Sequence, residues 1–201
     1  MDNKKFIGVI LAAGFSSRAE TFKMTLKFGE NTVIENTIIK MSKYCSKIIV
    51  VGGYKIERLN FLSDKYDFVE LIFNENYKDG MYSSVLKGFN RALEETNWEN
   101  IIFTPGDYPA VRQEVYKRLI DISQHEASEN IIIPIYKEKD YFRNGHPIIL
   151  KKKLLTKNNL TDYGNLREFL YKRKQTHVKV EDKAILKDLD TMEDYKELLN
   201  M

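Results

Sequence analysis

Five short apolar runs that do not alternate with polar residues constrain the fold more than any other feature of this sequence. They span Phe6 to Leu11, Ile48 to Val51, Val69 to Phe73, Ile101 to Phe103 and Ile131 to Ile135. Such runs are typical of strands that are buried on both faces of a sheet. We therefore expect a central sheet that other elements cover on both sides.

Segments with a helical, amphipathic period separate these runs. Apolar residues recur near a 3.6-residue period in Thr32 to Lys43, in residues 80 to 95 and in residues 111 to 124. Strands and helices that alternate at this spacing predict an α/β fold with a doubly wound, mostly parallel sheet. The length of 201 residues predicts a single domain over residues 1–201.

The alternation of predicted strands and helices stops after the fifth apolar run. The stretch YKEKDYFRNGHPIIL predicts a strand, a polar excursion with a turn at Asn144-Gly145, and a returning strand from Ile148. This small hairpin excursion is a candidate cover for a site. Beyond it we expect a helix near Asn165 to Arg173, a strand at His177 to Val180 and a last helix from Met192 to Leu199.

Composition and charge narrow the classes of function. The formal net charge of +3 is too small an excess to indicate nucleic acid binding, whereas a local basic pocket for a phosphate group fits it equally well. No stretch approaches the ~20 apolar residues that span a membrane. The single cysteine, Cys45, fits a small buried residue in a protein of the reducing cytoplasm. We expect Lys151-Lys152-Lys153 to be a solvated surface patch.

The first apolar run leads into a loop of small residues followed by two cations. Ala12-Ala13-Gly14 allow a ligand to approach the backbone closely, and Ser16 and Ser17 add hydroxyl groups. With Arg18 and Lys23, the loop fits a cradle for a polyphosphate, although an ordinary loop fits the same residues. It is not a Walker P-loop, because Gly-Lys-Ser/Thr is missing, and it is not a dinucleotide fingerprint, because G-x-G-x-x-G is missing.

A carboxylate follows the fourth run, in the stretch TPGDYP. Asp107 stands between Gly106 and Pro109, at the end of a predicted strand and in a stiff turn. This placement suits Mg²⁺, which takes one or two carboxylates together with phosphate oxygens and water. An Asp that caps a helix starting near Val111 is the open alternative.

The stretch LKDLDTMEDY carries more acidic residues near the C-terminus. If it is extended, we expect only one of Asp188 and Asp190 to face a site. Thr191 and Asp194 fit a variant of the capping box at the start of the last helix. The open alternative is that all these acids serve the N-terminus of that helix.

Two further stretches contain candidate binding residues. In YKDGMYSSVLKG, Gly80, Ser83 and Ser84 are predicted at a helix start, where polar or anionic ligand groups bind, although a plain N-cap also fits them. His146, in NGHP, is expected to be exposed by its turn and to be structural or merely solvated, and a catalytic role is the open alternative.

Taken in order, these segments resemble the molybdenum cofactor cytidylyltransferase family, which belongs to the nucleotidyltransferases with a GT-A-like, Rossmann-like fold. The similarity is collinear over nearly the whole chain. Its motifs are LAAGFSSR, then Lys23 and TLKFGENTVIE, GGY at 52–54, NENYKDGMYSSVLKG at 74–88, GDYP at 106–109, GHPIIL at 145–150, LTDYGNLREFL at 160–170 and DLDTMEDY at 188–195.

The resemblance implies roles for particular residues. Arg18 and Lys23 would contact the phosphates and act in catalysis with Asp107, and Asp107 and Asp190 would bind Mg²⁺. Other nucleotide contacts would come from Leu11, Ala12, Ala13, Gly14, Ser16, Gly80, Ser83, Ser84 and Gly106. The acceptor side would be lined by Gly145, His146, Pro147, Asp162 and Gly164.

The implied reaction transfers CMP from CTP to the terminal phosphate of the molybdopterin cofactor and releases pyrophosphate. The LAAG form favours CTP over GTP, because the guanylyl relatives usually read LAGG. One alternative keeps the chemistry but uses GTP or another phosphorylated acceptor, such as a sugar or alcohol phosphate. Another is a non-catalytic carrier that hands the cofactor to a molybdenum hydroxylase.

The chain departs from the family pattern in three places. Glu20 stands where the family usually has Gly, Lys27 and Phe28 replace a usual Pro, and Met192 replaces the Pro of the last motif. The first two departures affect the expected shape of the phosphate loop and its nucleotide preference. Glu20 is also the main support for the carrier alternative.

Overall fold

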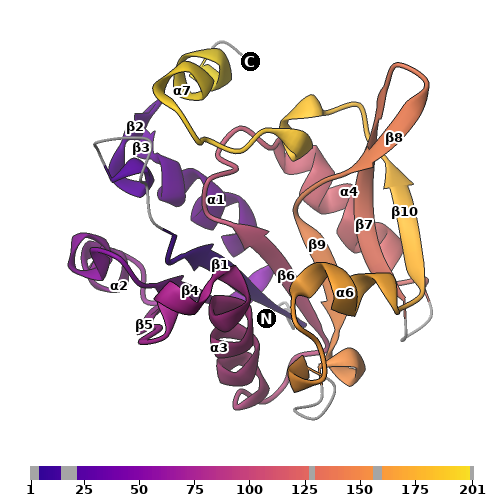
Figure 1. Ribbon diagram of the computed structural model, residues 1–201, viewed down its shortest axis with the longest axis horizontal. Helices are drawn as coiled ribbons and strands as arrows, with labels where there is room; N and C mark the ends of the chain where they lie inside the picture. Colours follow the sequence, from indigo (N-terminus) through magenta and orange to yellow (C-terminus); the bar gives the residue numbers. More distant parts are fainter. Residues whose placement is uncertain (1–4, 15–21, 127–129, 156–159, 200–201) are drawn as a thin grey trace.

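An eight-stranded sheet forms the centre of the computed structural model, which describes residues 5–14, 22–126, 130–155 and 160–199 (Figure 1). The strand order is β10-β7-β9-β6-β1-β4-β5, with β8 paired to β7. β8 and β9 are antiparallel to their neighbours, and the other strands run in one direction, so the predicted α/β class with a mostly parallel sheet is confirmed. The strands are β1 (Phe6–Ala12), β4 (Cys45–Gly52), β5 (Val69–Phe73), β6 (Asn100–Pro105), β7 (Ile131–Glu138), β8 (Tyr141–Asn144), β9 (Ile148–Lys151) and β10 (Gln175–Lys179).

Helices cover both faces of this sheet, as the unalternating apolar runs predict. Ile10 and Val50 pack with α1 and α4 on one face, whereas Val9 and Val51 pack with α3 and α6 on the other. Consecutive strand residues thus enter two different hydrophobic layers, and both layers exclude water. The helices are α1 (Val33–Ser42), α2 (Phe61–Lys65), α3 (Met81–Leu93), α4 (Gln113–Ser123), α6 (Leu166–Tyr171) and α7 (Met192–Leu199).

The hairpin after β7 exists, but its turn differs from the predicted one. Glu138 pairs with Tyr141, so the turn is Lys139-Asp140, and Lys139 has a positive φ of 56°. The prediction of a turn at Asn144-Gly145 was wrong, because these residues connect β8 to β9. The returning strand does begin at Ile148, as predicted, and it lies between β6 and β7.

The structure tests the predicted exposure of Cys45 and of the lysine run 151–153. Cys45 is buried, as expected. Lys153 is exposed, as expected for a solvated surface patch, whereas Lys151 and Lys152 are half exposed and Lys151 donates a hydrogen bond to the carbonyl oxygen of Ser123. Burial lowers the pKa of its ammonium group.

A small cluster at one corner holds the C-terminal helix in place. Val33 at the start of α1 packs with Leu189 and with Leu198 of α7. A short hairpin of β2 (Lys27–Phe28) and β3 (Asn31–Thr32) leads into α1, whose first turn is closed by a capping box between Thr32 and Glu35. Over the described part of the chain, no helix combines the length and the apolar character needed to cross a membrane.

Candidate active site

The loops that follow β1 and β6 start side by side. These strands are parallel neighbours, and Leu11 pairs with Pro105 at their carboxyl ends. The backbone N–H of Gly106 then donates to the carbonyl oxygen of Leu11 over 2.8 Å. The sheet therefore brings the small-residue loop and the GDYP loop together at the edge where open α/β sheets bind ligands.

The segment before α7 joins the GDYP loop. The backbone N–H of Leu189 donates to the carbonyl oxygen of Asp107 over 3.0 Å, and the Leu189 side chain is fully buried. Carboxylate oxygens of Asp107, Asp188 and Asp190 all lie within 4.8 Å of one another. The expectation that only one of the last two faces the site was wrong. Residues two apart in an extended segment share one side, and burial of Leu189 turns both of its neighbours away from the core.

Asp194 caps a helix, whereas Asp107 does not. Helix α4 begins at Gln113, and it is Asp182 that accepts from the backbone N–H of Arg112, so Asp107 does not cap this helix. The predicted capping box of Thr191 and Asp194 is confirmed, with hydrogen bonds in both directions. Asp194 serves the helix, but the carboxylates of Asp188 and Asp190 lie with that of Asp107, so the alternative that every acid of this stretch serves the helix is wrong.

Lys23 lies among these carboxylates, at the start of the short 3-10 helix Lys23–Thr25. Its Nζ donates to Asp107 Oδ2 at 2.7 Å and to Asp190 Oδ1 at 3.1 Å, and only 11% of its side chain is exposed. Burial by itself lowers the pKa of Lys23, but the two ion pairs outweigh it and the net pKa is raised. Burial raises the pKa of Asp188, and the charges of Asp190 and Asp107 add to that effect.

A cavity of about 350 Å³ opens beside this cluster. It joins the first loop, the segment before α3 and the GDYP loop, which lie far apart in the sequence. Ala12 is buried within β1 and does not line the cavity, and Ser16, Arg18 and Glu20 lie outside the described residues. The lining residues are Leu11, Ala13, Gly14, Lys23, Met24, Tyr77, Lys78, Gly80, Met81, Ser84, Pro105 and Asp107.

The start of α3 is shaped by a residue that the sequence analysis did not select. Asn74 is 2% exposed, and its Nδ2 donates to the hydroxyl oxygens of Ser83 and Ser84, both at 2.9 Å. Gly80 precedes the helix with a φ of +98°, a conformation that favours glycine. The available signal was a polar residue directly after the third apolar run, which is where ligand-side residues of such sheets concentrate.

The predicted acceptor turn packs against the GDYP loop. The His146 ring lies 5.1 Å from that of Tyr108, centroid to centroid, and 6.0 Å from that of Phe103. His146 is half-buried rather than exposed, so that expectation was wrong, and burial lowers its pKa to about 4. Gly145 is buried beside it, where a Cβ would lie 2.4 Å from the carbonyl oxygen of Ile185. Pro147, also buried, follows a cis peptide bond.

The second acceptor segment lies beside the first turn of α3, next to residues that line the cavity. The Tyr82 hydroxyl donates to the carbonyl oxygen of Leu160 and so ties this segment to α3. The backbone N–H of Gly164 donates to Glu168 in the following helix, and Asp162 is exposed. In the residues that the structure describes, no hydrogen bond or ion pair links Asp162 or Gly164 to the carboxylate cluster.

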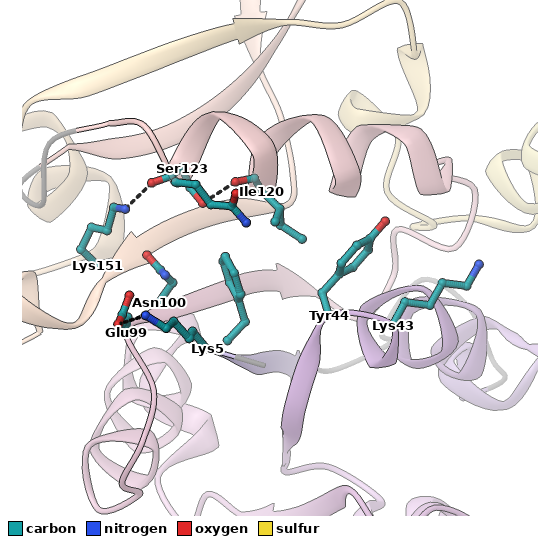
Figure 2. Close-up of a pocket in the computed structure, with 10 residues that line it drawn as sticks. Lys5, Lys43, Tyr44, Glu99, Asn100, Ile120, Ser123 and Lys151 are labelled. Atoms are coloured by element: carbon teal, nitrogen blue, oxygen red, sulfur yellow. Dashed lines mark hydrogen bonds and ion pairs between the residues drawn. The ribbon is translucent and has the colours of Figure 1, made fainter. Parts of the chain in front are cut away.

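A second cavity, of about 570 Å³, lies at the opposite end of the strands from the carboxylate cluster (Figure 2). Its walls come from the amino ends of β1 and β6, and Figure 2 shows the Lys5–Glu99 and Lys151–Ser123 contacts there. It contains none of the predicted site residues and none of the clustered carboxylates. The candidate active site is therefore the smaller cavity. The larger one is lined by Lys5, Phe6, Lys43, Tyr44, Glu99, Asn100, Ile120, Ser123, Gln124 and Lys151.

Known proteins resemble this chain over most of its length. The model of the MobA-like NTP transferase domain matches residues 8–178. The chain is 27% identical to the molybdenum cofactor cytidylyltransferase of Escherichia coli K12, over 93% of this chain and 92% of the relative.

Two solved structures show the same fold at lower sequence identity. The 4-diphosphocytidyl-2C-methyl-D-erythritol synthase of Anaerococcus prevotii superposes with a TM-score of 0.77 at 16% identity, covering 99% of this chain and 96% of that one. A Mycobacterium tuberculosis H37Rv protein solved in complex with manganese gives a TM-score of 0.73 at 20% identity, covering 98% and 99% of the two chains.

Proposed function

Because the chain belongs to the MobA-like NTP transferase family and is a nucleotidyltransferase, we propose that it transfers CMP from CTP to the terminal phosphate of the molybdenum cofactor. A phosphate oxygen of the acceptor attacks the α-phosphorus of CTP, the bond to the β-phosphate breaks, and pyrophosphate leaves. The observation that carries the proposal is the meeting of Lys23 with Asp107, Asp188 and Asp190 at the small cavity.

The carboxylate cluster fits a divalent metal ion. Oδ1 of Asp107 is buried and has no hydrogen-bond partner among the described residues, and buried carboxylate oxygens normally have one. Asp107 and Asp190, with Asp188 beside them, supply the oxygen ligands that Mg²⁺ prefers. When bound, such an ion would neutralise charge on the triphosphate and polarise its phosphorus–oxygen bonds.

The protein's side chains and backbone would stabilise the leaving group and bind the nucleotide. The Lys23 ammonium, together with Arg18 from outside the described residues, would stabilise charge on the leaving pyrophosphate. The backbone of Leu11, Ala13 and Gly14 and the start of α3 would hold the nucleotide. The acceptor phosphate is ionised near neutral pH, so no strong general base is needed, and His146 with its low pKa is neutral there.

A pyrophosphate-release assay tests the proposal. The protein is incubated with Mg²⁺ and each of the four nucleoside triphosphates, with and without molybdenum cofactor. We expect rapid release only with CTP and the cofactor together. No release with any nucleotide would contradict nucleotidyl transfer to this acceptor.

Three other outcomes correspond to the alternatives. The fold shared with a synthase of a cytidylylated alcohol phosphate favours that acceptor class as the second candidate, and it predicts release with CTP and an alcohol phosphate. Release with GTP would identify the guanylyl branch. Metal-dependent CTP binding, measured by calorimetry, separates an enzyme from a pure carrier that serves a molybdenum hydroxylase, for which we expect none. Both enzyme alternatives imply a cytoplasmic protein with small-molecule substrates.

A further inference from the structure

The Lys23 ammonium lies where a metal ion on the paired carboxylates would lie. Its Nζ contacts one oxygen of Asp107 at 2.7 Å and one oxygen of Asp190 at 3.1 Å. A metal ion bound by those same oxygens would lie about 2.1 Å from each. Two cations would then share two oxygen atoms in a pocket where only 11% of the Lys23 side chain is exposed. Repulsion between like charges is strong in such surroundings because water screens it poorly.

The Lys23 ammonium can also reach the cavity beside the carboxylate cluster. Lys23 also lines the nucleotide-sized cavity next to the cluster, together with Gly14, Gly80 and Ser84. A lysine ammonium is a compact charge on a flexible side chain, so it changes its contacts more readily than the planar guanidinium of an arginine. Phosphate groups entering that cavity would offer it a new anionic partner, and the carboxylate oxygens would be released.

We propose that Lys23 is a stand-in for the metal ion in the free protein, and that nucleotide binding withdraws its ammonium and so opens the carboxylate site to the metal. The inference rests on the proposed nucleotidyltransferase function. Nucleotide and metal then bind with positive coupling, and each raises the affinity of the protein for the other by the same factor. A metal ion without nucleotide competes with Lys23 and binds weakly.

The test is a titration with Mn²⁺ alone, in which free Mn²⁺ is counted by its electron paramagnetic resonance signal. We expect Lys23→Gln to bind Mn²⁺ about tenfold more tightly than the unmodified protein, because the competing cation is gone. Lys23→Arg keeps the charge and should bind as weakly as the unmodified protein. Lys117→Gln removes an exposed lysine of α4 and should change nothing.

Thermal unfolding gives an independent readout that does not use activity. Without metal, Lys23→Gln leaves Asp107 and Asp190 without their shared partner, so its midpoint should fall. Added Mn²⁺ should raise that midpoint more than it raises the midpoint of the unmodified protein, since tighter binding stabilises the folded state more. Equal or weaker Mn²⁺ binding by Lys23→Gln would overturn the stand-in role, as would an equal Mn²⁺ shift in both proteins.

The failure of this inference differs from failure of the proposed function. If Lys23→Gln binds Mn²⁺ no better while the unmodified protein still releases pyrophosphate from CTP, only the stand-in role is lost. If Lys23→Gln does bind Mn²⁺ more tightly but neither protein binds a non-hydrolysable CTP analogue in the presence of Mn²⁺, the nucleotide part fails and the exchange of cations stands.

Discussion

The backbone N–H of Leu189 donates a hydrogen bond to the carbonyl oxygen of Asp107 over 3.0 Å, and this contact assembles the candidate active site. It ties the segment before the last helix to the loop after β6. The buried Leu189 side chain fixes the orientation of that segment, and its two acidic neighbours consequently face the carboxylate of Asp107.

Asp107→Asn should abolish most of the activity without loss of the fold. The amide removes a negative charge from the metal ligands, while the hydrogen bond to Leu189 uses only the backbone and is kept. We expect Mg²⁺-dependent pyrophosphate release to fall by at least about 100-fold, the scale of losing one electrostatic group in an active site. Asp121→Asn, on the exposed side of α4, is the matched control. Near-normal release by Asp107→Asn would show that the metal assignment is wrong.

Asp188→Asn should stabilise the metal-free protein and weaken metal binding. The folded-state pKa of Asp188 is raised by burial and by its acidic neighbours, so ionisation of this group costs stability at neutral pH. The unfolding midpoint at pH 7 should rise by about 2 °C. The gain should vanish below the unfolded-state pKa, since Asp188 is then protonated in both states. A fall in the midpoint at pH 7 would contradict this account, and Mn²⁺ titration would measure the weaker metal affinity.

Thr191→Val should loosen the start of α7 and, through it, the metal site. The substitution keeps the side-chain shape but removes the hydroxyl that accepts from the backbone N–H of Asp194. Loss of such a cap costs about 1 kcal/mol, measurable by urea denaturation. Because Asp190 precedes this cap directly, the Mg²⁺ concentration needed for half-maximal activity should rise. Thr191→Ser retains the hydroxyl and should behave normally; if both variants behave alike, the cap is not the cause.

Glu35→Gln should lower stability in a manner that depends on pH. Burial raises the pKa of Glu35, but hydrogen bonds from Lys65, Thr32 and Tyr66 outweigh this and lower it to about 2. A lowered carboxyl pKa stabilises the fold above the unfolded-state value, and this contribution is lost as pH falls toward the folded-state pKa. The shift corresponds to about 2 kcal/mol once the half exposure of Lys65 is allowed for.

The measurement for Glu35→Gln is the unfolding free energy at a series of pH values. The difference from the unmodified protein should be largest near pH 7, shrink below about pH 4.5 and be nearly absent at about pH 2. Glu114→Gln, in the first turn of α4, serves as a control for a change of charge near a helix start. A pH-independent difference would mean that packing, rather than the carboxylate charge, accounts for the loss.

The local sequence pattern was enough to predict most helices and strands, but not the residues that pack against them. The strand from Val69 to Phe73 and the helix from Met192 to Leu199 have the bounds that the sequence predicts. The turn at Asn144-Gly145 was misplaced although Asn-Gly is a strong hairpin signal, because Lys139 takes the positive φ instead. His146 was expected to be exposed for the same local reason, and packing against Tyr108 decided otherwise.

The residues of the candidate active site likewise fall into those that local pattern predicts and those that it does not. The residue types and their order predicted a loop with Lys23 and a strand-end carboxylate at Asp107, because small residues, cations and acids at strand ends are local properties of a sequence. Asn74 was not predicted, and Asp188 was expected at the site only if Asp190 was not, since the importance of both residues comes from the side chains they meet.

The sequence by itself thus determined the α/β alternation, most helix and strand positions and the chemical character of the candidate groups. Periodicity and residue type act over a few residues, so they can be read without knowing the fold. Only the tertiary structure decided that Lys23 meets Asp107 and Asp190, which lie 84 and 167 residues away along the chain. That meeting depends on the pairing of β1 with β6 and on burial of Leu189, and both are long-range packing events that no local pattern encodes.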